Sequence, residues 1–455
     1  MNDPGFLRLL GRRDVLALAF GAMVGWSWVV LTGNWISEAG VGGAIGAFLL
    51  GGTIMTLIGL TYAELASALP YTGGEHVYAH RAIGPGSAFL CTWAITFGYV
   101  SVCAFEAVAL PTVIASFVPG LERWPLWTLA GWTVTLPWIA IGAVAAMVVT
   151  ILNVIGVRTA ALVQALVVLW MLAVGAIFIT GVALEPSAAL GTEPLFANGG
   201  SGFLAVLVMV PFLFVGFDVI PQAAEEIAVP AAAIGRLIVL SVALATLWYA
   251  LIIGGVAFAL PAAARDGSEL VTADAMRAVW GDTGAAALIL AGLGGIITSW
   301  NAFVVGGSRA IFAMAEAGQL PGLLAELHPR YRTPYRAILL IGLLAALAPP
   351  FGRPALVWLV NAGGLGIVIA YATVAAAFLK LRQREPNLQR PYRVPFGPLV
   401  GWTALALSLA LFVLYLPGSP AALAWPVEWV LVLAWSALGG LFWFTRTTVG
   451  SRSRS

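Results

Sequence analysis

The stretch from residue 202 to residue 228 reads GFLAVLVMVPFLFVGFDVIPQAAEEIA. Its length and its largely apolar character fit a helix that crosses a lipid bilayer, for which about 20 residues are needed. Pro211, Gly216 and Pro221 interrupt the run, and Asp218 places a carboxyl group inside it. Because proline and glycine weaken or break a helix, the sequence predicts a membrane helix that unwinds near its centre.

The composition of the whole chain is that of a membrane protein. Of 455 residues, 61% are hydrophobic and 9% are charged, whereas soluble domains carry about 25% charged residues. In hydrocarbon, only helices and closed barrels pair every backbone amide and carbonyl group. Barrel strands alternate apolar and polar residues, but this chain has continuous apolar runs, so we predict an all-α membrane protein.

About 12 transmembrane helices can be marked along the chain. They cover residues 14–37, 43–69, 86–117, 133–153, 158–183, 202–228, 233–260, 284–315, 336–351, 355–380, 398–416 and 425–445. The polar stretch from Pro261 to Asp282 is too short to span and is predicted to be an external loop with a little helix. No linker divides the chain, so residues 1–455 are expected to form a single transmembrane domain.

Basic residues indicate the orientation. If the N-terminus is cytoplasmic, all of the 22 Lys and Arg residues fall in cytoplasmic segments except Arg123, Arg265, Arg277 and Arg353. Cytoplasmic segments of membrane proteins are enriched in these residues. An even number of spans then places both termini in the cytoplasm, and the chain is predicted to be a multi-pass protein of the cell's inner membrane.

The first span is interrupted in the same way as the sixth. Gly21, Gly25 and Gly33 lie in residues 14–37, five spans before the interrupted stretch 202–228. A repeat of five spans inverts between its two copies, and paired broken helices in inverted repeats mark a midplane binding site in secondary transporters. The alternative is that these glycines only allow close helix packing.

Three groups of motifs accompany these spans. They read YAEL at 62–65, PYTGGEHVY at 70–78, GFD at 216–218, EE at 225–226, SR at 308–309 and AMA at 313–315. Together they resemble the amino acid–polyamine–organocation permeases over essentially the whole chain. The resemblance implies a LeuT-type core in residues 1–380, with spans 1–5 and 6–10 as inverted repeats and discontinuous helices 1 and 6. Residues 381–455 would supply two peripheral helices and a cytoplasmic C-terminus.

The centre of span 1, GAMVGWSW at residues 21–28, is the first part of the predicted substrate site. An unwound segment exposes amide groups that suit a carboxylate and carbonyl groups that suit an ammonium group. Trp26 either caps a small site or packs outward. The substrate-binding residues predicted here are Ala22, Met23, Gly25, Trp26 and Ser27.

The resemblance adds further site residues. It implies that Phe212 stacks on the substrate, although most transmembrane phenylalanines simply pack. It also places Phe303 and Glu106 in the pocket, where Glu106 would pair with a cationic group or carry a proton; alternatively, this carboxyl group reaches water at the outer interface. The remaining predicted substrate-binding residues are Gly98, Cys103, Val215, Gly216 and Gly363.

Gating and coupling are assigned to Asp218, Tyr371 and Glu106. A carboxyl group deep in a bilayer is costly and is functional by default, and the resemblance gives Tyr371 the place of an intracellular gate. Some relatives carry a lysine in span 5 that replaces a sodium ion, but this span 5 has none. Thr298 and Ser299 are the only sodium candidates, and such hydroxyl groups often bond their own helix backbone instead. No other metal and no cofactor is expected.

The function predicted is secondary active transport. An amino acid or related amine would cross the inner membrane by alternating access, coupled to H⁺ as symport or exchange. Alternatives are a sodium-coupled or uncoupled carrier of polyamines or organocations, or a channel or sensor on the same scaffold. No catalytic cluster indicates an enzyme, and no basic run with interleaved aromatics indicates nucleic acid. The partners expected are the small-molecule substrate, H⁺ and the lipid bilayer, with the protein a monomer or homodimer.

Overall fold

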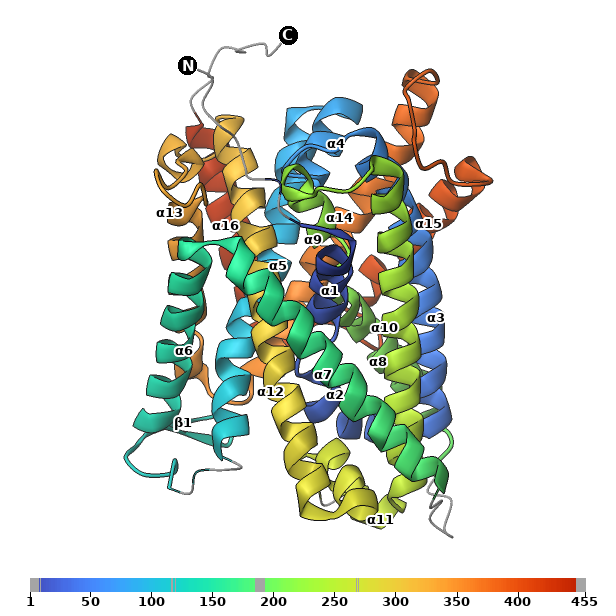
Figure 1. The fold of residues 1–455 in the computed structure, drawn as a ribbon, viewed down its shortest axis with the longest axis vertical. Helices are drawn as coiled ribbons and strands as arrows, with labels where there is room; N and C mark the ends of the chain where they lie inside the picture. The colour runs from blue at the N-terminus through green and yellow to red at the C-terminus, as the bar shows by residue number, and fades with distance from the viewer. Residues whose placement is uncertain are drawn as a thin grey trace.

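The computed structural model describes residues 8, 10–115, 118, 120–184, 193–266, 268 and 270–446, without the side chains of residues 157–163. Most of the described chain is helical, and the long helices lie side by side along one axis (Figure 1). The predicted cytoplasmic positions of residues 1–7 and 447–455 lie outside the described residues.

The helices divide into those before and those after residue 199. The first group comprises α1 (Arg12–Met23), α2 (Ser27–Val30), α3 (Thr32–Ala68), α4 (Glu75–Ala82), α5 (Pro85–Ala115), α6 (Leu136–Ile155) and α7 (Val157–Leu184). The second comprises α8 (Gly199–Phe214), α9 (Val219–Gln222), η1 (Ala224–Glu226), α10 (Ala231–Ala259), α11 (Ala262–Asp266), α12 (Val271–Glu316), η2 (Gly322–Ala325), α13 (Tyr335–Ala346), η3 (Pro349–Phe351), α14 (Ala355–Arg384), α15 (Gly397–Leu414) and α16 (Val427–Thr445). Strands β1 (Pro125–Leu129) and β2 (Trp132–Thr135) form an antiparallel hairpin between α5 and α6.

The number of spans agrees with the prediction. Within the described chain, 11 helical segments are long and apolar enough to cross a membrane, and the segment Tyr335–Phe351 is a shorter apolar helix. Gly40, with a φ of 74°, bends α3, so that the part before it continues span 1. Gly281, with a φ of 66°, bends α12 in the same way, so that the part before it is the predicted external helix.

Both predicted helix breaks are present. The first span stops at Met23 and resumes at Ser27, and the sixth stops at Phe214 and resumes at Val219. Gly216 lies in the second break with a φ of 139°, a conformation that residues with a Cβ rarely adopt. The prediction of an all-α membrane protein with discontinuous helices 1 and 6 is confirmed.

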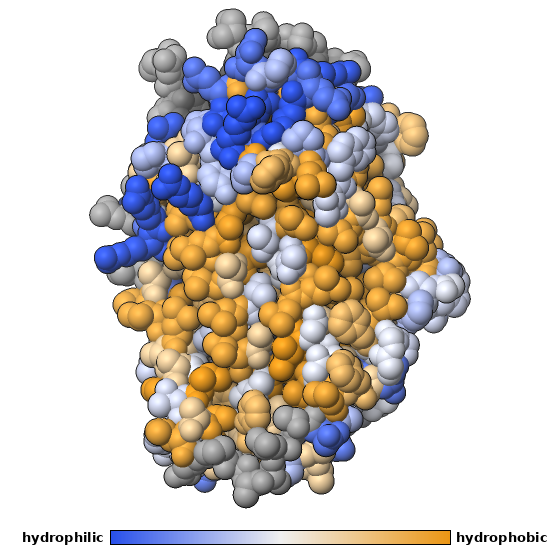
Figure 2. Space-filling model, turned by 90° about the vertical axis from the view of Figure 1, so that its right-hand side faces the viewer, coloured by the Kyte–Doolittle hydropathy of each residue, from blue (hydrophilic) through white to orange (hydrophobic). Residues whose placement is uncertain are grey.

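Burial separates a core from a periphery. The most apolar 18-residue window of α5 is 89% buried, whereas those of α15 and α16 are 28% and 11% buried. The two C-terminal helices therefore lie at the edge of the bundle and leave most of their surface for lipid. Figure 2 shows the corresponding broad hydrophobic belt, with a hydrophilic zone at one end.

The two ends of the bundle differ in charge. One end carries α4 with Arg81, the start of α1 with Arg12 and Arg13, and the end of α14 with Arg382 and Arg384. The opposite end carries the β hairpin and α11 (Figure 1). The first is called the arginine-rich end below.

Candidate functional site

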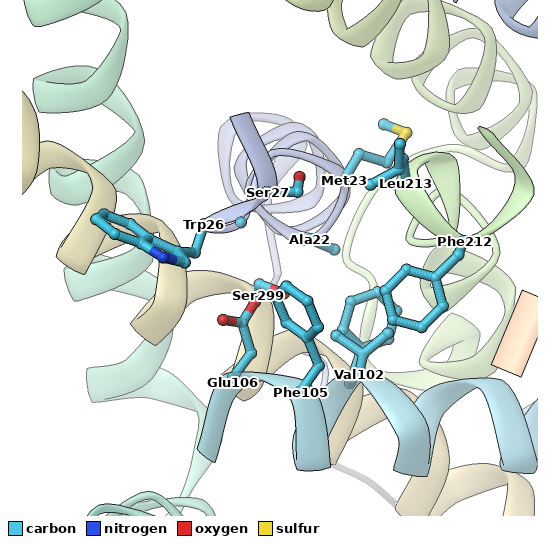
Figure 3. A pocket seen from close by; sticks show the side chains of 12 residues that line it. Ala22, Met23, Trp26, Ser27, Val102, Phe105, Glu106, Phe212, Leu213 and Ser299 are labelled. Carbon is cyan, nitrogen blue, oxygen red and sulfur yellow. The ribbon is translucent and has the colours of Figure 1, made fainter. Parts of the chain in front are cut away.

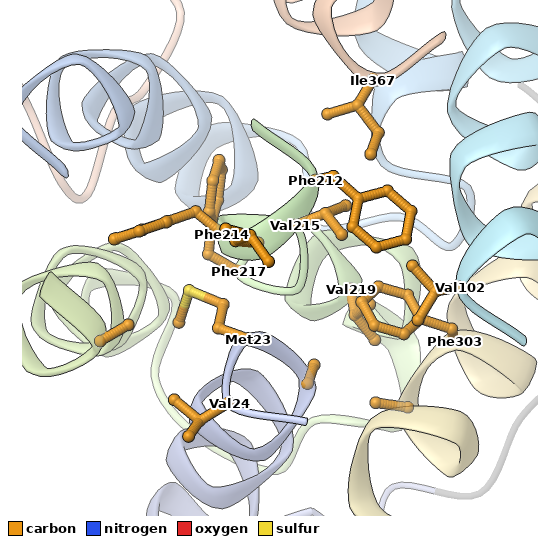
Figure 4. Close-up of a cluster of buried hydrophobic side chains, with 14 of the residues drawn as sticks. Met23, Val24, Val102, Phe212, Phe214, Val215, Phe217, Val219, Phe303 and Ile367 are labelled. Atoms are coloured by element: carbon orange, nitrogen blue, oxygen red, sulfur yellow. The ribbon is translucent and has the colours of Figure 1, made fainter. Parts of the chain in front are cut away.

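The two helix breaks touch each other. A Cβ atom on Gly216 would lie 2.6 Å from the Cβ of Ala22 and 3.0 Å from the amide nitrogen of Met23. Figure 4 shows Met23 and Val24 beside side chains of the sixth span. The absence of a side chain at Gly216 therefore lets the unwound backbones meet in the middle of the core.

Unwinding leaves backbone groups free. The amide of Val24 still donates to the carbonyl of Phe20 at 2.9 Å, and the amide of Val219 donates to the carbonyl of Gly216 at 3.2 Å. In the described part of the chain, the amides of Gly25 and Phe217 make no backbone hydrogen bond. Such groups at interrupted helices are the donors that secondary transporters use for anionic parts of their substrates.

A cavity lies beside the breaks (Figure 3). Its volume is about 20 Å³, which is room for roughly one or two water molecules. It is lined by Ala22, Met23, Gly25, Trp26, Ser27, Val102, Phe105, Glu106, Phe212, Leu213, Ser299 and Phe303. The structure thus brings together most of the predicted residues of spans 1, 3, 6 and 8.

Glu106 supplies the charge of this cavity. Its side chain is 1% exposed and lines the cavity together with Ser299. A Cβ atom on Gly25 would lie 2.6 Å from Oε1 of Glu106, so the carboxyl group faces the unwound part of span 1. Its Oε2 atom has no hydrogen-bond partner among the described residues. The position is buried and does not reach water at the outer interface.

Aromatic rings form the opposite wall. Phe212 is 6% exposed, and its ring centroid lies 6.0 Å from that of Phe105. Behind it, a Cβ atom on Gly363 would lie 3.2 Å from Cε2 of Phe212. Phe303 packs with its ring centroid 5.5 Å from that of Tyr99. The cavity therefore has a carboxyl group on one side and apolar rings on the other.

Trp26 combines the two arrangements that the sequence left open. It lines the cavity, but Figure 3 shows its indole pointing away from Phe212. The ring lies against α12, where it occupies the space that a side chain at Gly292 would need. Trp26 therefore closes one side of the cavity and packs into the core.

Five predicted binding residues do not line the cavity. Gly98 packs against Ile367 of α14, and the others lie in the break of span 6, within α5 or behind Phe212. These five residues are Gly98, Cys103, Val215, Gly216 and Gly363. Their small size or their position in the break shapes the walls, but the structure does not place them at the cavity surface.

Asp218 lies on the arginine-rich side of the break. The hydroxyl group of Tyr99 donates to its Oδ2 at 2.6 Å, and the amide of Gly216 donates to its Oδ1 at 2.6 Å. Tyr371 lies nearby, with its ring centroid 5.8 Å from that of Tyr62. The carboxyl group thus stabilises the broken segment, and Tyr99 is a partner that sequence reasoning missed.

Comparison with known proteins identifies the family. The model of the amino acid permease family matches residues 10–438. The chain belongs to the amino acid permease family. It is similar to the methylthioribose transporter of Bacillus subtilis (strain 168), with 28% identity over 460 residues that cover 97% of this chain and 94% of the relative.

Other relatives carry different names. The branched-chain amino acid permease BcaP of the same organism is 27% identical, over 97% of this chain and 94% of its own. The lysine-specific permease LysP of Escherichia coli (strain K12) is 26% identical, over 87% of this chain and 84% of its own. The chain is therefore a multi-pass membrane transport protein of this class.

In this permease, the hydroxyl groups of the two candidate sodium ligands, Thr298 and Ser299, do not face the same site. The hydroxyl group of Thr298 donates to the carbonyl of Gly21 at 3.1 Å, whereas Ser299 faces the cavity. The side-chain amide of Gln164, from span 5, donates to the carbonyls of Thr298 at 3.2 Å and Ala17 at 3.4 Å. A neutral amide group therefore links spans 1, 5 and 8 at this position.

A further residue of the site was not foreseen. The hydroxyl group of Tyr249, on α10, donates to the carbonyl of Met23 at 2.6 Å and lies 3.0 Å from the hydroxyl group of Ser27. It thereby satisfies a carbonyl group that the break in span 1 sets free. The only signal in the sequence was one phenol group in a largely apolar span.

Proposed function

We propose that this permease carries a small solute with an ammonium group, an amino acid or a related amine, by alternating access around the cavity between the two helix breaks. The observation that supports it most is the carboxyl group of Glu106. A buried carboxylate needs a counter-charge or hydrogen bonds, and its Oε2 atom lacks a partner among the described residues. The ammonium group of the solute would supply that partner.

The helix breaks provide the complementary half of the site. The free amides of Gly25 and Phe217 lie at interrupted helices, where partial positive charge favours a carboxylate. An amino acid carries both an ammonium and a carboxylate group, so it matches both halves. A plain amine would use only the side of Glu106.

The cavity size implies that the site must widen to load. A volume of about 20 Å³ holds roughly one or two water molecules, so the solute needs the rings of Phe212 or Phe303 to move. Their apolar surfaces favour an uncharged side chain. Among the solutes named for the relatives, branched-chain amino acids suit these walls better than lysine does.

Coupling and orientation complete the proposal. Transport is driven by H⁺ as symport or exchange. A sodium ion at Thr298 would need oxygen atoms that already have partners, because the amide of Gln164 donates to the carbonyls of Ala17 and Thr298 and the Thr298 hydroxyl group donates to the carbonyl of Gly21. The arginine-rich end would face the cytoplasm, because cytoplasmic segments of membrane proteins are enriched in Lys and Arg, and the membrane would be the inner membrane of the cell. Transport changes no covalent bond of the solute, so the permease is a carrier and not an enzyme.

Uptake by proteoliposomes tests this function. A panel of labelled amino acids and amines is offered to purified permease with and without a pH gradient, in sodium and in choline buffers. Glu106→Gln is expected to weaken the affinity for the accepted solute at least about tenfold, equivalent to about 1.4 kcal/mol, because the ion pair is lost. Glu122→Gln, in the exposed segment between α5 and the hairpin, is the matched control.

Each outcome has a defined meaning. Wild-type affinity and wild-type pH dependence in Glu106→Gln would refute the role of this residue. Exchange that survives in this variant while pH-driven accumulation is lost would make Glu106 the proton carrier instead of the ammonium partner. Uptake by the wild type that requires sodium would refute the proton coupling.

A further inference from the structure

A second group of polar side chains is buried between the cavity and the arginine-rich end. Glu75, the first residue of α4, is completely buried, and the side-chain amide of Gln222 donates to its Oε2. Its Oε1 atom forms no hydrogen bond with the described residues, and neither do the hydroxyl groups of Tyr62, Tyr78 and Tyr371. Several polar atoms without hydrogen-bond partners among the described residues thus share one buried compartment.

The glycines of the 70–78 motif place Glu75 there. Gly73 and Gly74 have φ values of 93° and 29°, and the amide of Gly73 donates to the carbonyl of Gln222 at 3.3 Å. A Cβ atom on Gly74 would lie 3.0 Å from the carbonyl carbon of Pro221. The turn therefore presses against the inner half of span 6 and carries Glu75 into the interior. The structure thus shows what this motif positions.

Other buried carboxyl groups at this end have arginine partners. Glu64 lies 2.9 Å from Nε of Arg382 and 2.9 Å from Nε of Arg390, and Glu226 lies 2.8 Å from Nε of Arg309. Each of these carboxyl groups is thus held in a buried ion pair.

Glu75 lacks such a partner among the described residues. The titratable groups that interact with it are Asp218, Tyr62, Tyr78, Cys91, Tyr99 and Tyr371, from α3, α4, α5, α14 and the break of span 6. The neighbouring His76 faces Thr92, 3.2 Å from its hydroxyl group, and burial lowers the pKa of His76 to about 4. At neutral pH this histidine carries no charge that could balance Glu75.

The two carboxyl groups of this compartment are therefore unequal. Burial, followed by the charge of Asp218, raises the pKa of Glu75 well above its usual range. Asp218 accepts two hydrogen bonds, from Tyr99 and from the amide of Gly216, and such bonds favour its charged form. Two carboxylates in one buried site disfavour each other's charged form, so Glu75 is the group expected to hold the proton.

We propose that Glu75 and Asp218 share one exchangeable proton, and that Glu75 exchanges it with water at the arginine-rich end. In each cycle the O–H bond of Glu75 breaks and the proton leaves to water. Asp218 takes a proton from water in the open cavity and passes it to the carboxylate of Glu75 within the buried compartment that the two groups share. No other bond changes, and the step moves one proton. This inference rests on the proposed function and names its coupling group.

Glu75→Gln in proteoliposomes tests the inference. Two measurements are made with a labelled solute that the wild type accepts: exchange at equal pH on both sides, and accumulation driven by a pH gradient. Glu75→Gln is expected to keep exchange and to lose pH-driven accumulation, because the amide keeps the shape but holds no exchangeable proton. Glu225→Gln, at a half-buried glutamate that contacts the backbone of Thr72, should behave as the wild type in both.

Three outcomes would overturn the inference. The first is wild-type accumulation by Glu75→Gln, and the second is loss of exchange together with accumulation in a variant whose melting temperature is unchanged. If Glu75→Gln does not fold, Glu75→Asp is measured in its place. The third outcome is then a rate of exchange that depends on pH in Glu75→Asp just as it does in the wild type. In each case the wild type still exchanges the solute, so the proposed function stands. Absence of exchange by the wild type would overturn the proposed function itself.

Discussion

Gly25→Ala is the sharpest single test of the binding site. The added methyl group would lie 2.6 Å from Oε1 of Glu106 and 3.0 Å from both Cβ and Oγ of Ser299, whereas ordinary contact begins at 3.4 Å. The overlap with the carboxyl oxygen is therefore about 0.8 Å. Glu106 and Ser299 must both move away from the unwound segment.

The magnitude follows from packing energetics. Inserting a methyl group into a filled interior costs about 1–3 kcal/mol, and every 1.4 kcal/mol is a tenfold change in affinity. If the cost falls on the loaded site, Gly25→Ala binds its solute between about fivefold and about 150-fold more weakly. The methyl group also fills much of a cavity of about 20 Å³, so the upper part of this range is expected.

The assay is equilibrium binding of a labelled amino acid that the wild type accumulates, measured on purified protein in detergent. Gly254→Ala is the matched control, because a Cβ atom at this glycine of α10 would meet nothing within 4 Å. Thermal melting shows whether each variant is folded. Wild-type affinity in a folded Gly25→Ala protein would refute the placement of the solute between Gly25 and Glu106.

Two further predictions concern stability. Tyr249→Phe removes the hydroxyl group that donates to the carbonyl of Met23 at 2.6 Å. The free energy of unfolding should therefore fall by about 1–3 kcal/mol, which is measured as a lower melting temperature. An unchanged melting temperature would mean that water replaces the phenol hydroxyl group. The guanidinium group of Arg81 lowers the pKa of Glu385 from 4.5, so the pair stabilises the fold above about pH 4.5 and loses this contribution as the pH falls through the lowered pKa. Glu385→Gln should therefore have a slightly lower melting temperature than the wild type at pH 7, because exposed ion pairs contribute at most about 1 kcal/mol. This difference in melting temperature should disappear at lower pH. A difference that stays constant with pH would contradict the stabilising role of the Arg81–Glu385 pair.

The sequence by itself determined the architecture. Apolar runs of bilayer length give the spans because hydrocarbon requires local backbone pairing, and this depends only on neighbouring residues. The interruptions at Gly25 and Gly216 were likewise predictable, since a broken helix follows from glycine and proline within the run itself. The polar stretch after Pro261 was too short to span for the same local reason.

Parts of the candidate site were predictable from single residues. Glu106 and Asp218 stand out as carboxyl groups in apolar spans, where their desolvation is costly. Phe212 and Phe303 do not stand out in this way, because phenylalanine is common in such spans; the family resemblance selected them. The structure places both at the cavity, but their role in binding stays a prediction.

Only the tertiary structure decided which distant groups meet. Tyr249 lies 226 positions from the carbonyl of Met23 that it satisfies, and Gln222 lies 147 positions from Glu75. A tyrosine, a glutamine or a glutamate has no local signature for such contacts, because each depends on how separate helices pack. Glu75 is a buried acid without an arginine partner because the turn at Gly73 and Gly74 lies close to span 6. No single segment of the chain encodes this close approach.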